Sequence, residues 1–139
     1  MTDRHAFNDH VVADLRAHQG QASEGPFAGR RLLVLTTTGA RSGLPRTSPL
    51  AYTRDGEAYV VIASKGGAPT HPAWYHNLLA HPMVTVEVDG RRFRALAEPV
   101  HGAERRRLYD AQAAVMPGFA EYETRTERVI PVVRLVPTA

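Results

Sequence analysis

The most unusual run of side chains lies at positions 71 to 77, which read His-Pro-Ala-Trp-Tyr-His-Asn. The run holds Trp74, the single tryptophan of the chain, beside a tyrosine, two histidines and the amide of Asn77. His71, His76 and His81 are five residues apart, so on a helix they do not share a face as i, i+4 metal ligands do. No Asp or Glu lies among them, and we therefore expect no metal site. Trp74 is either a core anchor, the usual role of a lone tryptophan, or a wall for a flat ligand.

Two loops could bind an anionic or flat ligand. Residues 36–46 (TTTGARSGLPR) combine hydroxyls and glycines with Arg41 and Arg46, whose guanidinium groups could grip a phosphate or carboxylate. The glycine spacing is not that of a P-loop, and no Gly-Lys-Ser/Thr follows. In residues 64–67 (SKGG), the glycines would let a flat ligand approach the backbone, and the serine hydroxyl could bond a heterocycle. Taken alone, each loop is more typical of an ordinary solvated turn.

Composition and the remaining motifs argue against several other functions. The chain has no cysteine and no Gly-x-Ser-x-Gly elbow, so neither a thiolate nucleophile nor a serine hydrolase is indicated. The net charge of +3 permits an anionic partner without demanding one. Acidic residues flank the arginine triplet 105–107 within an amphipathic pattern, which favours a solvated helix face over a nucleic-acid site. Lys65 is the only lysine, and Tyr122 is a possible proton donor to a bound substrate.

The elements that must position these residues are short and mostly extended. Aliphatic runs predict strands, Asp55-Gly56 and Asp89-Gly90 predict hairpin turns, and Pro49 predicts an edge strand or a bulge. About six antiparallel strands with a few helices fit one α+β domain, a closed or half-closed small barrel, over residues 1–139, with residues 1–28 as an N-terminal helix and loop. We expect helices at 5–19, 72–80, 102–116 and from there to about 126, and strands at 31–37, 46–54, 58–64, 83–88, 91–100 and 129–136.

Taken in order, these motifs resemble the deazaflavin-dependent nitroreductase family. The resemblance covers roughly residues 29 to 136 and rests on five segments, namely LTTTGARSGLPR, PL, ASKGGAP, HPAWYHNL and RVIPV. It implies a split β-barrel of the type that binds flavin mononucleotide. It also implies a reductase that binds coenzyme F420, a deazaflavin with a phosphate and a glutamate tail, and passes its hydride to a quinone or nitro compound.

The resemblance also implies roles for individual residues. Arg41 and Arg46 match positions that grip the anionic tail of the cofactor. Other matching positions lie against or enclose the deazaflavin ring or line the acceptor site. Ser64 and Tyr122 are the candidate proton donors in catalysis, with water as the alternative. The expected cofactor residues also include Pro49, Ser64, Lys65, Gly66, Gly67, Trp74 and Asn77, and the expected substrate-lining residues are Met116, Phe119 and Tyr122.

Alternative functions remain open from the sequence. The same fold could use flavin mononucleotide, or the protein could carry F420 without catalysis. We expect a small-molecule acceptor, no nucleic-acid partner, no metal, and a monomer or homodimer. The N-terminus shows no signal-peptide pattern, so a cytoplasmic location is predicted, with peripheral contact of the N-terminal helix at the inner membrane surface left open.

Overall fold

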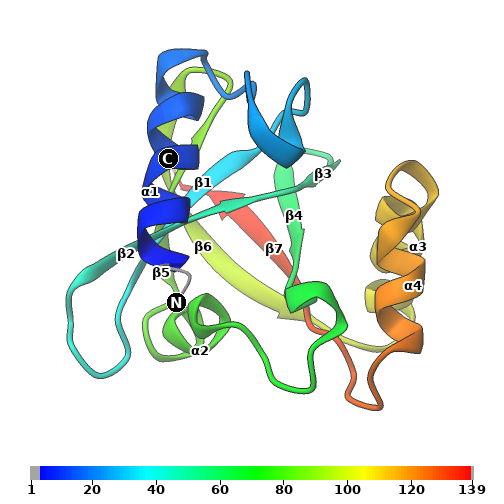
Figure 1. The fold of residues 1–139 in the computed structure, drawn as a ribbon. Coiled ribbons are helices and arrows are strands. Elements are labelled where there is room, and N and C mark those ends of the chain that lie inside the picture. The colour runs from blue at the N-terminus through cyan, green and yellow to red at the C-terminus, as the bar shows by residue number, and fades with distance from the viewer. Residues whose placement is uncertain (1–3, 139) are drawn as a thin grey trace.

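The computed structural model describes residues 4–138, with side chains from residue 7 onward, and consists of one curled antiparallel sheet with helices around it (Figure 1). The strand order is β2-β1-β5-β6-β7-β4-β3. The elements are α1 (Arg4–Ala17), the 3-10 turn η1 (Gly25–Phe27), β1 (Leu33–Thr38), β2 (Pro45–Leu50), β3 (Thr53–Asp55), β4 (Ala58–Ile62), the 3-10 turn η2 (Lys65–Gly67), α2 (Ala73–Ala80), β5 (Met83–Val88), β6 (Arg91–Val100), α3 (Gly102–Val115), α4 (Gly118–Thr124) and β7 (Val132–Pro137).

Both predicted hairpins are present. Gly56 and Glu57, directly after Asp55, connect β3 to β4, and Asp89 and Gly90 connect β5 to β6. Gly56, Asp89 and Gly90 all have positive φ, the conformation that tight hairpins require and that glycine and aspartate tolerate. The turns therefore fix the register of strands that are apolar on the face turned toward the core.

The curl of the sheet follows from its two edge strands. β2 and β3 lie at opposite edges, yet only Ala51 and Tyr52 separate them in sequence. One extended stretch, residues 45–55, thus crosses from one edge to the other and draws the edges together (Figure 1). The strand ladder stays open between β2 and β3, so the barrel is split and not closed.

Three apolar clusters hold the elements together. The main cluster lies on the concave face, where α2 packs on the sheet through Trp74 and Leu78. A second cluster joins α1 to the outer face of β1. A third joins α3 to the outer face of β4 and β7, and α4 packs against it through the partly buried Phe119 and Tyr122. The main cluster therefore positions α2, whereas α1, α3 and α4 rest on satellite clusters.

Most predicted strand and helix bounds agree with the structure within about two residues, and three differences are larger or change the topology. The strand expected at 46–54 is two strands, β2 and β3, which gives seven strands in place of about six, because the chain leaves one sheet edge for the other at Ala51. The loop after β4 contains the 3-10 turn η2. The last strand begins at Val132, three residues later than expected, because residues 125–131 lead from α4 back to the sheet. The prediction of Pro49 in an edge strand is confirmed.

Candidate functional site

A cleft of about 560 Å³ opens between the sheet and the surrounding helices, within the range of 300 to 1,000 Å³ typical of small-molecule sites. Its walls come from α1 and η1, the β2–β3 stretch, η2, α2 and the start of α4. The lining residues are Asn8, Pro26, Phe27, Arg30, Leu32, Ser48, Pro49, Leu50, Ala51, Ile62, Ser64, Lys65, Gly66, Pro72, Trp74, Met116, Pro117, Gly118, Phe119 and Tyr122.

One wall of the cleft, here called the sheet-side wall, consists of Pro49, Ile62, Ser64 and Trp74. Trp74 is only 8% exposed and belongs to the main apolar cluster, yet it also lines the cleft. Trp74 is therefore a core residue that also borders the cleft, and its role as a wall for a flat ligand stays a prediction. The Ser64 hydroxyl makes no hydrogen bond to any described residue, so it is available to a ligand.

The η2 loop supplies the backbone of this wall. Gly66 has φ +64° and no atom within 4 Å of the position that a Cβ would take, so the chain is open to the cleft there. Gly67 faces the other way. A Cβ on Gly67 would lie 2.9 Å from the Tyr122 carbonyl oxygen and 2.9 Å from the Arg125 Cβ. The two glycines expected to admit a ligand thus differ, since only Gly66 lines the cleft and Gly67 packs on α4.

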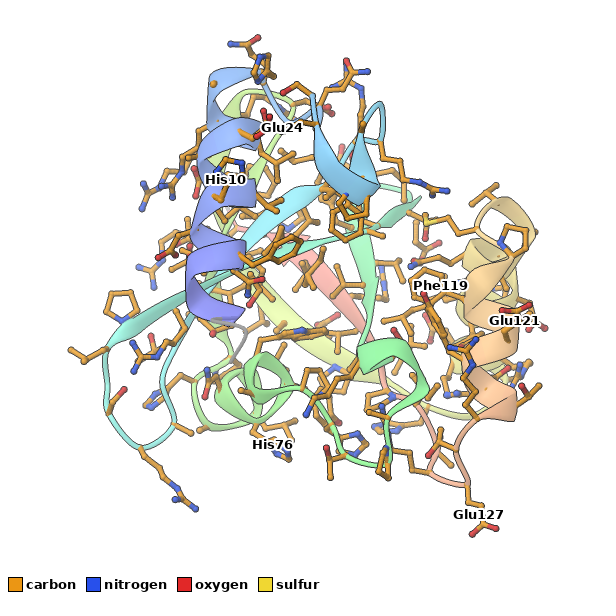
Figure 2. All side chains as sticks on the ribbon, in the orientation of Figure 1. His10, Glu24, His76, Phe119, Glu121 and Glu127 are labelled. Carbon is orange, nitrogen blue, oxygen red and sulfur yellow. The ribbon has the colours of Figure 1, made fainter. Side chains whose placement is uncertain are left out.

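A second wall, here called the helical wall, consists of Met116, Phe119 and Tyr122. Figure 2 shows Phe119 on the side of α4 that faces the sheet and Glu121 on the side that faces away. The Phe119 and Tyr122 rings pack edge to face with centroids 5.2 Å apart. All three predicted substrate-lining residues therefore share one surface with the predicted cofactor loop.

Polar contacts fasten the helical wall to α3. The Tyr109 hydroxyl donates to the Phe119 carbonyl oxygen over 2.6 Å, and burial raises the pKa of Tyr109 to about 12, so it stays a donor at ordinary pH. Glu123 accepts two hydrogen bonds from Arg106, at 2.9 and 2.7 Å, and one from Arg105 at 3.3 Å. The arginine triplet is thus more than the solvated face that the sequence suggested, because it ties α3 to α4 and, through Arg107 and Asp55, to β3.

The cleft is electropositive. Of its lining residues only Arg30 and Lys65 are charged, and both are cations. Arg46 lies outside the lining but is opposite Thr37 in the β1–β2 ladder, as Ser48 is opposite Leu35. Directly paired residues share a sheet face, so Arg46 stands on the face of Ser48, one step of about 7 Å farther along the strand.

Besides Arg46 and Gly67, two more predicted cofactor residues, Arg41 and Asn77, lie outside the cleft. Arg41 is exposed in the turn between β1 and β2, on the same hairpin as Arg46. Asn77 is buried on α2, where its Oδ1 accepts from the Ala40 N–H at 2.9 Å and its Nδ2 donates to the Thr37 hydroxyl at 3.2 Å. Asn77 therefore anchors the turn that carries Arg41, while its helix neighbour Trp74 forms the wall.

Sequence reasoning missed several residues of the site. Asn8, Phe27 and Arg30 enter the cleft from the N-terminal segment, which was expected only as a helix and loop. Arg128 was noted within a motif but given no role, yet its side chain contacts the η2 loop. A half-buried arginine in a segment of mixed charge gives no local signal of such a contact.

Two absences concern the described part of the chain. No cluster of three or more His, Cys, Asp or Glu residues in it could hold a metal ion. None of its helices combines the length and apolar character needed to cross a membrane.

Fold and cleft together define a split-barrel protein with an electropositive cofactor-sized site. A heme storage protein of Vibrio cholerae shares this fold with a TM-score of 0.57 at 15% identity, covering 95% of this chain and 91% of that one. The sequence model of the F420H(2)-dependent quinone reductase family matches residues 9–137. The chain belongs to this family of oxidoreductases.

Individual relatives agree with the family assignment. An F420H(2)-dependent quinone reductase of Mycobacterium tuberculosis is 46% identical over 106 residues, which cover 74% of this chain and 71% of that protein. The solved structure of an F420-H2 dependent reductase is 38% identical with a TM-score of 0.69, covering 75% of this chain and 92% of that one. A chain solved as a domain-swapped dimer is 33% identical with a TM-score of 0.72, covering 94% and 95%.

Proposed function

We propose that this protein uses reduced coenzyme F420 to reduce a quinone, with the cofactor ring against the sheet-side wall and the acceptor against the helical wall. The observation that carries the proposal is one cleft that joins the predicted cofactor loop, Trp74 and the α4 residues. Membership of the quinone reductase family supports the choice of cofactor and acceptor. A nitro compound is the second acceptor class that the resemblance implied.

The residues present fit such a cofactor. Trp74 and Ile62 offer apolar surface to a planar ring, and Gly66 allows close approach of the ring to the backbone. Arg30 and Lys65 are the charged lining residues, which suits a ligand with a phosphate and a glutamate tail. Arg46 and then Arg41 continue the positive charge along the hairpin, and we propose that they bind the tail.

The bound cofactor supplies the hydride, and the chain supplies orientation, exclusion of water and the proton. Ser64 is 8% exposed and its hydroxyl has no described partner. Tyr122 lines the helical wall of the same cleft. We propose that one of these two hydroxyls, or water, delivers the proton to the reduced acceptor. Replacing each by Ala or Phe and measuring single-turnover hydride transfer separates the three, since unchanged rates in both variants leave water as the donor.

An acceptor screen tests the function as a whole. Purified protein is titrated with oxidised F420 and, separately, with flavin mononucleotide, each followed by fluorescence. Reduced F420 is then mixed with quinones and nitro compounds without air. We expect F420 binding and fastest turnover with a quinone. Tight binding of flavin mononucleotide without F420 binding would reject the cofactor, and F420 binding without turnover would leave a carrier protein.

Assembly and location complete the proposal. The relative solved as a domain-swapped dimer supports a homodimer, which sedimentation velocity tests against a monomer. A cytoplasmic location and peripheral membrane contact through α1 stay predictions, and flotation with lipid vesicles tests the contact.

A further inference from the structure

Arg128 is the most heavily engaged side chain around the cleft, although it does not line it. Its guanidinium group makes five hydrogen-bond contacts, as the donor, to four acceptor atoms of one loop. Nε donates to the Ala68 carbonyl at 2.8 Å, and Nη2 donates to the Ser64 carbonyl at 2.7 Å. Nη1 and Nη2 each lie 3.2 Å from the Ala63 carbonyl oxygen, and Nη1 lies 2.8 Å from His71 Nδ1.

These contacts span residues 63–71, the segment that carries Ser64, Lys65 and Gly66 into the cleft. The carbonyls that Arg128 binds come from both sides of η2, so the guanidinium closes the segment as a loop around that turn. Gly67 packs on the other side against Tyr122 and Arg125 at the end of α4. The loop is thus held between Arg128 and α4, and residues outside the cleft set its conformation.

We propose that Arg128 is a positioning residue that holds residues 63–71 in the form that binds the cofactor, and that its grip requires a neutral His71. This inference rests on the proposed function only for the identity of the ligand. Arginine suits the role because its planar fork presents five donors in fixed geometry, which a lysine cannot reproduce. Arg128 stands outside the cleft lining and acts through the carbonyls of Ala63, Ser64 and Ala68.

The requirement for neutral His71 follows from the donor pattern. Arg128 can only donate, so Nδ1 of His71 must accept, and protonation would set a donor and a second positive charge against the guanidinium. Burial, then the charge of Arg128, then His76 lower the pKa of His71 below its usual value of about 6.5. Tyr75 and His76 of α2 are the other titratable groups that face the His71 ring, with ring centroids 5.0 and 5.8 Å away.

The sign of the pH effect follows from that lowered pKa. Because the closed loop favours neutral His71, its contribution is full above about pH 6.5 and is lost as pH falls from there through the lowered pKa of the closed form. The loop should therefore open more often in mild acid.

The single lysine allows the loop to be tested without any cofactor. A lysine-specific endoproteinase has one cleavage site, after Lys65, and cleaves native protein only when the loop opens. We expect Arg128→Gln to raise this native-state cleavage rate about tenfold, the scale of losing charge-assisted hydrogen bonds. Arg134→Gln is the matched control, because Arg134 is also half-buried and its ion pairs, with Asp55 at 3.3 Å and Glu104 at 3.7 Å, join β3 and α3 and not the loop or α4.

Arg134→Gln should leave the cleavage rate within about twofold of wild type once global stability, measured by urea unfolding, is taken into account. Equal acceleration in both variants would mean that Arg128 contributes only general stability, and the proposal would be wrong. Titration with oxidised F420 gives the second measurement. We expect Arg128→Gln to raise its Kd about tenfold with kcat at saturation within about twofold, and faster cleavage with unchanged Kd would also overturn the proposal.

A pH series tests the His71 contact. Cleavage is measured from about pH 7.5 to 5.5 relative to an unstructured peptide with one lysine, which corrects for the protease. Wild type should show a rising ratio, His76→Asn the same rise, and His71→Asn a flat ratio, because an Asn oxygen accepts from Arg128 without titrating. If the cleavage ratio of His71→Asn still rises as the pH is lowered, another group causes the pH effect and the proposed role of His71 is wrong. If wild type binds no F420, the proposed function is wrong. The cleavage results still test whether Arg128 keeps residues 63–71 closed, because they need no cofactor.

Discussion

The two walls of the cleft differ in the contacts that hold them in place. The sheet-side wall is joined to the main core through Trp74, which shares its cluster with residues of β1, β4, β5, β6 and β7, and through Ser64, which directly follows buried Ala63. The helical wall stands on α4, a helix of seven residues with none of them buried, which polar contacts from Tyr109, Arg105 and Arg106 hold in place. The surface proposed for the cofactor thus cannot change without disturbing the core, whereas the surface proposed for the acceptor can vary at small cost to stability. Substitutions on each wall test this contrast.

The largest effect is expected at Trp74. Trp74→Ala should lower the free energy of unfolding by about 3 to 5 kcal/mol, because it leaves a cavity in the main cluster, and should abolish F420 binding. Urea denaturation measures the first and fluorescence titration the second. Trp74→Phe is the control that keeps an aromatic wall, and it should retain part of both. A loss below about 1 kcal/mol for Trp74→Ala would show that this wall is not rooted in the core.

The two glycines of η2 give a matched pair with intermediate effects. Gly67→Ala should cost about 2 to 3 kcal/mol, since it adds a 2.9 Å contact to a residue at φ +82°. Gly66→Ala has open space and should cost about 1 kcal/mol of backbone strain alone. Urea midpoints and slopes for both variants provide the comparison. Similar losses would mean that α4 moves aside, and the helical wall would then be looser than its contacts suggest.

Phe119 tests the helical wall directly. Phe119→Ala should cost about 1 to 2 kcal/mol, less than a core aromatic, because the side chain is only partly buried. We expect the KM for the acceptor to change several-fold while the Kd for F420 stays within about twofold. If Phe119→Ala changes the Kd for F420 more than the KM for the acceptor, the helical wall binds the cofactor and our assignment of the two walls is wrong.

A smaller effect concerns the pH dependence of the helical wall. Hydrogen bonding to Arg106 lowers the pKa of Glu123 below its usual value of about 4.5, so the stability from this contact is full above that pH and is lost as pH falls through the lowered pKa. Glu123→Gln should lower the free energy of unfolding by at most about 1 kcal/mol at pH 7. It should also reduce the loss of stability that wild type shows as the pH falls below about 4.5. Thermal unfolding between about pH 3 and 7 measures both effects. If the variant loses as much stability in acid as wild type does, the loss comes from other carboxylates.

The smallest effect on stability is expected at the exposed hairpin. Arg46→Gln should change the free energy of unfolding by less than about 0.5 kcal/mol, yet weaken F420 binding about three- to tenfold at low salt, with the difference shrinking as salt is added. Arg92→Gln, an exposed arginine on β6, is the control and should bind as wild type. If both variants bind F420 with the same affinity, the proposal that the hairpin binds the anionic tail of the cofactor is wrong.

Local signals in the sequence predicted most of the fold. The Asp-Gly pairs predicted the hairpins, and β5 and β6 have the predicted bounds, because turn chemistry and alternation act within a few residues. The cleft was harder to predict. Asn77 faces the β1–β2 turn and Arg128 grips a loop sixty residues earlier, and such contacts depend on the tertiary fold. Among the residues that the resemblance named, Trp74 lines the cleft whereas Gly67 and Asn77 pack inside the protein, because the side of a segment that faces the cleft depends on the tertiary fold.

The free edge of β2 has a consequence for association between molecules. An unpaired strand edge normally offers a row of N–H and C=O groups to a second chain, which is a route to aggregation. Here Pro45 and Pro49 both lie in β2 and remove donors from that row, and Arg46 adds charge. The opposite edge, β3, has only three residues. The prolines of β2 and the shortness of β3 thus make pairing of a second chain along either open edge of the sheet unfavourable.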